Sequence, residues 1–237
     1  MLCLVGVVIS LNYSLNAMLA AILVITLLYI FFLFAMSMLI QFNFYIKTIN
    51  ENTVQKIALT FDDGPHPVHT LPILNILDEL NVKAVFFMIG KNVKDYPEIA
   101  KEVSRRGHQI GVHSQNHAIN FGFMSDKKLT NELKNCVVEI EAATGFKPVL
   151  FRPPFGVTNP KIAKAVWAQN LITIGWSIRS FDTVTKSADV ICKRIVSKLK
   201  GNSIVLLHDR MPLTVIALPL IIQNIRSKGL EIGKLTI

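Results

Sequence analysis

Cysteine is scarce in this sequence, with three residues in 237, and no charged residue occurs between Leu2 and Ile46. Three cysteines without metal-site spacing exclude a cysteine-ligated metal centre. Cys136 and Cys192 fall in helical patterns, so we expect two small buried hydrophobic residues rather than a disulfide. The sequence also lacks internal repeats and low-complexity segments, so we expect one catalytic domain rather than an array of repeats.

Acidic residues are few, with 16 Asp and Glu against 25 Lys and Arg, which gives a formal net charge of +9. All of this charge lies after Ile46, where lysines are scattered among acids. No array of basic and aromatic residues is present, so we expect no nucleic-acid partner. We interpret the charge as an ordinary basic surface. Attraction to anionic envelope polymers or lipid headgroups is the alternative.

The hydrophobic residues, 51% of the chain, are concentrated at the N-terminus. The run from Met18 to Ile40 is long enough to cross a hydrocarbon core as a helix. It lacks the polar stripe of a soluble core helix and the charged start and cleavage site of a signal peptide. We therefore expect an uncleaved membrane anchor in residues 1–46, with one span at about 18–40. The shorter apolar piece Met1–Leu11 leaves a second pass, as half of a hairpin, open.

After a short polar linker at residues 47–54, apolar β-rich runs alternate with amphipathic stretches through residues 55–237. This alternation predicts an α/β catalytic domain with a parallel sheet covered by helices. Seven strands suit an incomplete or distorted (β/α)7 barrel, and a doubly wound open sheet is the competing topology. The predicted strands are 56–61, 84–90, 108–113, 149–154, 171–177, 203–209 and 230–235, and the predicted helices are 71–80, 97–106, 127–143, 160–170, 188–199 and 213–228.

Residues that can bind metal or transfer protons follow directly after these predicted strands. The carboxyl ends of parallel strands form the active-site face of α/β folds, so we expect these residues to share one cleft. The adjacent acids Asp62 and Asp63 point in different directions in an extended chain, so one can face a metal and the other a water. A helix cap or a turn before Gly64 is the structural alternative.

His113 and His117 are four residues apart, a spacing that brings two imidazoles to one face over a helical turn. With one carboxylate they form an Asp-His-His set, which leaves an open position for water on a zinc ion. Arg152, at another strand end, can orient a carboxylate, whereas a structural turn would explain only the prolines and glycine that follow it. His208 is either a neutral core histidine or a general acid. The other histidines, His66, His69 and His108, are assigned to loops or the surface, with His66 and His69 as weaker candidates for the groove lining.

Together these residues resemble the polysaccharide deacetylase family, the NodB-like deacetylases of carbohydrate esterase family 4. TFDDGP, HSQNH, RPPFG and LLHD occur in the family's order, and the resemblance covers residues 56–235. It implies a distorted seven-stranded (β/α) barrel. It also implies metal-dependent hydrolysis of acetyl groups from N-acetylglucosamine polymers such as peptidoglycan, chitin oligomers or an exopolysaccharide. The catalytic domain is then expected outside the cytoplasm, where acetylated polymers lie.

The resemblance also implies roles for individual residues. Asp62 is the general base, Arg152 orients it, and His208 is the general acid. A divalent ion, most often Zn²⁺, is held by Asp63, His113 and His117. Substrate contacts are implied for Pro153, Phe155, Trp176 and Leu206, with a backbone N–H near Phe155 stabilising the oxyanion.

One motif departs from the family. Where many members have Asp-x-x-Asp-Trp, this chain has Arg179 and Thr183 at the outer positions and keeps only Asp182, which supports the catalytic acid or the arginine. Because base, ligands and acid are complete, we expect an active enzyme. An esterase acting on O-acetyl groups of xylan and a catalytically silent glycan-binding membrane protein are the alternatives.

Overall fold

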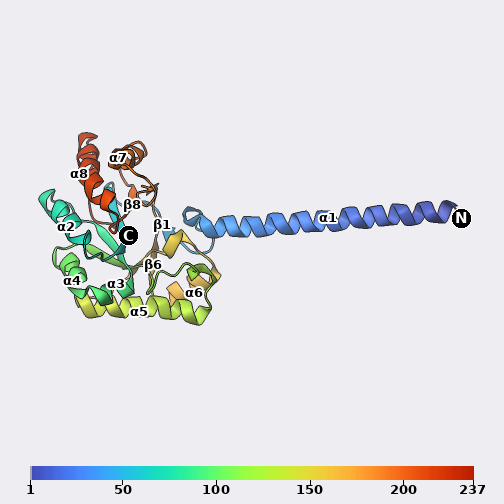
Figure 1. Cartoon of the computed structure of the whole chain (residues 1–237), viewed down its shortest axis with the longest axis horizontal. Helices are drawn as coiled ribbons and strands as arrows, with labels where there is room; N and C mark the ends of the chain where they lie inside the picture. Colours follow the sequence, from blue (N-terminus) through green and yellow to red (C-terminus); the bar gives the residue numbers. More distant parts are fainter. Residues whose placement is uncertain (1) are drawn as a thin grey trace.

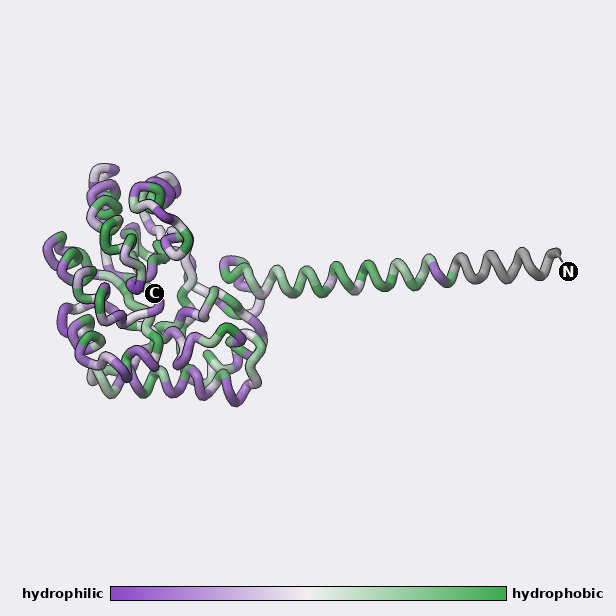
Figure 2. The backbone as a smooth tube through the Cα atoms, in the orientation of Figure 1, coloured by the Kyte–Doolittle hydropathy of each residue, from purple (hydrophilic) through white to green (hydrophobic). Residues whose placement is uncertain are grey.

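A long N-terminal helix projects from a rounded α/β domain (Figure 1). The computed structural model describes the backbone of residues 2–237 and side chains from Leu15 onward. Helix α1 spans Leu2–Met38 without interruption, and the Cys3 side chain lies outside the described residues. The segment Leu15–Met38 of α1 has a mean hydropathy of 2.8 and is not buried against the domain. Figure 2 shows this apolar character along the helix. By length and composition, α1 can cross a membrane.

Eight strands form one parallel sheet in the described part of the chain, in the order β1-β6-β5-β4-β3-β2-β8-β7. The sheet is curled, and its edge strands β1 and β7 do not pair with each other in the described part of the chain. The barrel is therefore incomplete, as predicted. The strands are β1 (Thr48–Ile49), β2 (Ala58–Gly64), β3 (Val85–Met88), β4 (Gln109–Val112), β5 (Leu150–Phe151), β6 (Ile172–Ile174), β7 (Ile178–Arg179) and β8 (Ile204–His208).

Helices pack around the outside of this curled sheet (Figure 1). Because side chains alternate along a strand, β2 points Leu59 and Phe61 outward into the core beneath the helices. Ala58 belongs to a second cluster inside the barrel, with Trp176 and Leu206. The helices are α2 (Thr70–Glu79), α3 (Gly90–Asp95), α4 (Pro97–Arg105), α5 (Asp126–Thr144), α6 (Pro160–Ala168), α7 (Ala188–Val196) and α8 (Pro212–Ser227), with 3-10 turns η1 (Ile40–Phe42), η2 (Phe121–Phe123) and η3 (Pro154–Gly156).

The first six predicted strands and all six predicted helices are confirmed in position. The prediction of a last strand at 230–235 is wrong. This segment forms only an isolated bridge, between Ile57 and Ile232. The Gln109 side chain instead holds Leu235 through bonds of 2.9 and 3.0 Å. Strands β1 and β7 went unpredicted because two residues are too few for a periodic signal. Strand β1 lies within residues 47–54, between the helix and the rest of the domain.

Candidate active site

The polar residues at the strand ends converge on one cleft at the carboxyl edge of the sheet. Asp62 and Asp63 directly precede Gly64, the last residue of β2, while His113 follows β4 and His208 ends β8. The cleft has a volume of about 190 Å³. It is lined by Asp62, Asp63, His113, His117, Phe155, Gly156, Trp176, Arg179, Thr183, Leu206, His208 and Arg210.

Asp63, His113 and His117 form the one group of metal-ligating side chains found among the described residues. Asp63 Oδ1 lies 3.5 Å from His113 Nε2 and 3.4 Å from His117 Nε2. This oxygen is buried and has no hydrogen-bond partner among the described residues. The Arg152 carbonyl can only accept, so His113 Nδ1 donates to it at 2.7 Å and leaves Nε2 as a ligand atom. An orphaned carboxylate oxygen facing two imidazoles fits a divalent cation.

The charges around this group favour the ligand form of Asp63. Burial alone would raise its pKa, but the neighbouring imidazoles, led by His113, hold the pKa far below its ordinary value. Burial and the nearby His113 lower the pKa of His117. An ionised carboxylate and a neutral imidazole are the forms that bind a metal.

The HSQNH segment is a turn rather than the helical turn expected from its spacing. Ser114 and His117 have left-handed backbone, with φ of 66° and 47°, which brings the His113 and His117 rings within 4.9 Å. The Glu132 carboxylate accepts two backbone N–H groups of this turn, at 3.1 and 2.9 Å. The backbone of Asp63 and of Phe155 also adopts the left-handed conformation. Strained backbone at four positions around one cleft is typical of a functional site.

Arg152 is fully buried and fixes Asp62. Its Nη1 donates at 2.7 Å to Asp62 Oδ1 and at 2.7 Å to Thr60 Oγ1. Its other nitrogens donate to the carbonyls of Ile174 and Gly175, and the guanidinium lies 4.2 Å from the centre of the Phe87 ring. Asp62 Oδ2 stays free of these bonds, 3.8 Å from His113 Nε2. One carboxylate oxygen is therefore anchored while the other faces the metal group.

His208 is paired with Asp182 on the other side of the cleft. Asp182 Oδ1 lies 2.7 Å from His208 Nδ1, while Oδ2 accepts from the His208 backbone N–H and from Thr214 Oγ1, each at 2.7 Å. A carboxylate can only accept, so Nδ1 carries a proton and Nε2 faces the cleft. Burial opposes a charged imidazole, but the Asp182 contact outweighs it and raises the pKa of His208. Asp182 thus supports the histidine, one of its two expected roles.

Three residues that the sequence analysis did not assign complete the surroundings of Asp63. Arg210 Nε donates to Asp63 Oδ2 at 2.7 Å, and Asn92 Nδ2 donates to the Asp63 carbonyl at 2.8 Å. Asp209 is buried, accepts from Thr70 Oγ1 at 2.6 Å, and has a pKa raised to about 7 by burial. Arg210 follows LLHD directly, so its place at a strand end was a usable signal.

The predicted substrate contacts divide into two groups. Phe155, Trp176 and Leu206 line the cleft, but Pro153 is buried and does not. The Pro153 carbonyl accepts the Gly156 N–H at 3.0 Å, so this proline shapes the loop.

The remaining histidines and cysteines lie away from the cleft lining. The expectation for His108 is wrong: it is 6% exposed, and its Nδ1 accepts the Ala84 N–H at 3.1 Å. His66 and His69 stack on each other, 4.7 Å apart. Cys136 and Cys192 are buried and unpaired, as predicted.

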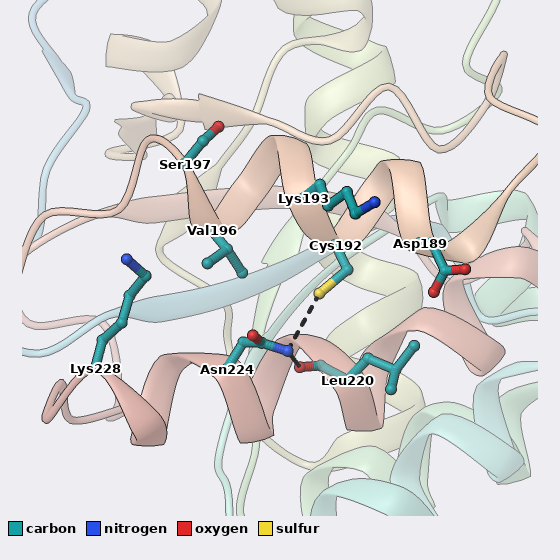
Figure 3. A pocket seen from close by; sticks show the side chains of 8 residues that line it. All are labelled: Asp189, Cys192, Lys193, Val196, Ser197, Leu220, Asn224 and Lys228. Carbon is teal, nitrogen blue, oxygen red and sulfur yellow. Dashed lines mark hydrogen bonds between the residues drawn. The ribbon is translucent and has the colours of Figure 1, made fainter.

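A larger cavity, of about 460 Å³, lies between α7 and α8 (Figure 3). Cys192 and Asn224 face each other across it, with Asn224 Nδ2 3.6 Å from the sulfur. No group of three metal-ligating side chains occurs there among the described residues. Each of the four ordered motifs contributes residues to the lining of the smaller cleft, which defines a hydrolase-type site with a metal group, an anchored carboxylate and a carboxylate-paired histidine.

Comparison with known sequences identifies the family. The polysaccharide deacetylase family model matches residues 50–171. A peptidoglycan-N-acetylglucosamine deacetylase of Bacillus cereus is 35% identical over 183 residues, which cover 75% of this chain and 85% of that protein. The chain therefore belongs to the polysaccharide deacetylase family. PgdA of Listeria monocytogenes, a peptidoglycan-N-acetylglucosamine deacetylase, is 33% identical over 76% of this chain, which spans only 38% of PgdA.

Solved structures agree on the fold. The Bc1960 peptidoglycan N-acetylglucosamine deacetylase superimposes with a TM-score of 0.74 and 29% identity, covering 78% of this chain and 89% of that one. A pseudoenzyme of carbohydrate esterase family 4 from Bacillus anthracis also gives a TM-score of 0.74, with 28% identity, covering 79% of this chain and 66% of its own. The fold thus occurs in both active and inactive members, so activity has to be argued from the residues in the cleft.

Proposed function

We propose that this chain is a membrane-anchored, metal-dependent deacetylase that removes the N-acetyl group from N-acetylglucosamine units of peptidoglycan or a related polymer. One observation carries the proposal. A cluster of three metal-ligating side chains, an arginine-anchored carboxylate and a carboxylate-paired histidine all line a single cleft. Each part corresponds to one requirement of amide hydrolysis.

Asp63, His113 and His117 would hold the metal, and a donor set of one oxygen and two nitrogens suits zinc. When bound, the ion supplies Lewis-acid polarisation of the acetyl carbonyl and of the attacking water. Arg210 and Asn92 keep Asp63 in place through its second oxygen and its backbone carbonyl. Such supporting contacts fix the direction in which a ligand atom points.

Asp62 is the general base in this proposal. Arg152 holds one of its oxygens, so the other receives the proton of the attacking water from a fixed position. The backbone N–H near Phe155 stabilises the developing oxyanion. Trp176 and Leu206 form an apolar wall for the acetyl methyl group. His208 Nε2 then protonates the departing amine, while Asp182 keeps the ring in the required tautomer.

Acetate release tests the reaction. The full chain in detergent is expected to release acetate from N-acetylglucosamine oligomers or peptidoglycan fragments. Chelator and Asp62→Asn should each remove that activity. Ile216→Asp, at an exposed position on α8 that does not line the cleft, is the matched control and should retain it. Acetate release that survives both chelator and Asp62→Asn would contradict the proposal.

Two other functions make distinct predictions. An O-acetyl esterase would use the same residues, so release of acetate from acetylated xylan but not from N-acetylglucosamine oligomers would favour it. A silent glycan-binding protein is motivated by the fold shared with a pseudoenzyme and by Arg179 and Thr183 in the cleft. It would bind metal and glycan without turnover. We favour the deacetylase because a silent protein has no physical need for base, ligands and acid together.

Helix α1 is the proposed anchor, with the catalytic domain outside the cytoplasm. The basis is the uncharged segment Leu15–Met38 and the location of acetylated polymers. Protease added to intact cells should digest the domain and leave the membrane segment protected. Digestion only after the cells are permeabilised would contradict this orientation.

A further inference from the structure

The end of α1 and the 3-10 turn η1 that follows it are bound to residues at or beside the cleft. Ser37 Oγ donates to the Thr158 carbonyl at 2.6 Å, and the Thr158 N–H donates back to the Ser37 carbonyl at 2.9 Å. Ile40, 2% exposed, belongs to the cluster inside the barrel that contains Trp176 and Leu206. Gln41 Nε2 donates to the Trp176 carbonyl at 3.4 Å. The helix therefore passes into the catalytic domain without a free linker.

This attachment fixes the height of the cleft above a membrane. Thr158 lies two residues beyond Gly156, which lines the cleft, and Trp176 lines it too. The apolar segment that can span a bilayer ends at Met38, next to Ser37. With α1 as the anchor, no free linker separates the span from the segments beside the cleft, so the domain is held close to the membrane surface.

The most exposed large apolar side chains described in the domain lie beside this attachment. Ile119 is 90% exposed and Phe123 is 88% exposed. Their loop is bound to the segment that holds α1, because Asn159 Nδ2 donates to the Gly122 carbonyl at 2.7 Å. Isoleucine and phenylalanine exposed next to a membrane span are suited to the boundary between headgroups and acyl chains. We call Ile119 and Phe123 the apolar rim.

The cleft also carries an unbalanced positive charge. Arg152 is paired with Asp62, and Arg210 with Asp63. Arg179 lines the same cleft, packs over the Phe181 ring at 5.0 Å, and has no ion-pair partner among the described side chains. It lies three residues after Trp176, whose carbonyl accepts from Gln41. A guanidinium free of carboxylates is a binding group for phosphate.

We propose that the substrate of this cleft is an N-acetylated saccharide still joined through phosphate to a membrane lipid, with the apolar rim in the headgroup region and Arg179 on the phosphate. This inference rests on the proposed deacetylase function and names its substrate class. The alternative substrate is an acetylated glycan that carries no lipid, which would use neither the apolar rim nor a phosphate contact of Arg179.

The first test locates the rim without measuring activity. The full chain is reconstituted in vesicles with or without brominated lipids, and the added tryptophan of Phe123→Trp is compared with that of Ile216→Trp on α8. Ile216 is the control because it is 59% exposed and lies on a helix away from the rim. Bromine should quench the fluorescence at position 123 and leave that at position 216 unchanged. Equal behaviour at the two positions would overturn the membrane-facing rim.

The second test compares two substrates for the same reconstituted enzyme. One is a polyprenyl-diphosphate-linked disaccharide containing N-acetylglucosamine, and the other is soluble chitopentaose. At equal bulk concentration we expect acetate release from the lipid-linked substrate to be faster by about tenfold or more, because both partners are confined to one surface. Ile119→Asp should remove most of this advantage and leave turnover of chitopentaose intact. Ile216→Asp should change neither rate.

The outcomes separate the two proposals. Turnover of chitopentaose at the same rate as the lipid-linked disaccharide, or an Ile119→Asp variant that keeps the full advantage, would overturn the substrate assignment and leave the deacetylase intact. No acetate from either substrate, nor from acetylated glycans in detergent, would overturn the proposed function itself.

Discussion

Replacing Asp182 with asparagine tests the assignment of the general acid through its pH dependence. Asp182 accepts three hydrogen bonds, two from His208 and one from Thr214, each at 2.7 Å. Its charge outweighs burial and raises the pKa of His208. A hydrogen bond to a charged group contributes about 1.5–3 kcal/mol, so losing that charge should lower the pKa of His208.

The sign follows from the role of His208. A general acid must be protonated, so activity is present below its pKa and lost as the pH rises through it. In Asp182→Asn the alkaline limb of kcat should therefore move about 1–2 units toward lower pH, with a loss of about 10- to 100-fold on that limb and less at acidic pH. The pH profile of acetate release between about pH 5 and 9 measures this.

Thr214→Val is the matched control, because it removes one hydrogen bond from an uncharged hydroxyl to Asp182 and keeps the Asp182 charge beside His208. Its alkaline limb should shift far less than that of Asp182→Asn. An Asp182→Asn enzyme with an unchanged alkaline limb and an unchanged rate would refute the assignment of His208 as the acid. Thermal unfolding of both variants separates a lost proton donor from a lost fold.

Three further predictions concern other parts of the chain. Gly64→Ala should destabilise the fold by about 1–3 kcal/mol in chemical denaturation, because the new Cβ would overlap the buried Asp209 carboxylate; wild-type stability would show that the carboxylate moves aside freely. Burial lowers the pKa of His108 to about 4, so folding stability should fall as the pH drops from about 6.5 toward 4, by at most about 3 kcal/mol, and His108→Gln should flatten that slope. An equally steep slope in the variant would assign the effect to other groups. His117→Ala should lower the metal content of the dialysed protein in mass spectrometry, whereas His66→Ala should not; equal metal content in the two would place the ion elsewhere.

Much of the fold was predictable because its strands are short, apolar and regularly interrupted by amphipathic helices. The site was predictable for a related reason: parallel strands bring their carboxyl ends to one edge, so residues after different strands had to meet. The structure places Asp62, Asp63, His113, His117 and His208 on the lining of one cleft. Periodicity could not predict the two-residue strands β1 and β7 or the final segment, which a glutamine side chain holds.

The sequence did not predict the loop conformation around the histidines, the burial of a single residue, or contacts between distant segments. The helical-turn interpretation of HSQNH failed because Ser114 and His117 adopt left-handed backbone that Glu132 stabilises from α5. His108 was assigned to the surface because a lone histidine gives no sequence signal for burial. The docking of Ser37 on Thr158 joins residues 121 positions apart, which no local pattern can indicate.

Metal titration of the stripped full-length enzyme is the most direct test of the central claim. Acetate release should rise in proportion to added Zn²⁺, level off near one ion per chain, and be absent at every metal concentration in Asp62→Asn, which still binds the ion. Activity that is independent of the metal, or a wild-type enzyme that binds one ion and releases no acetate from any acetylated glycan, would contradict the account.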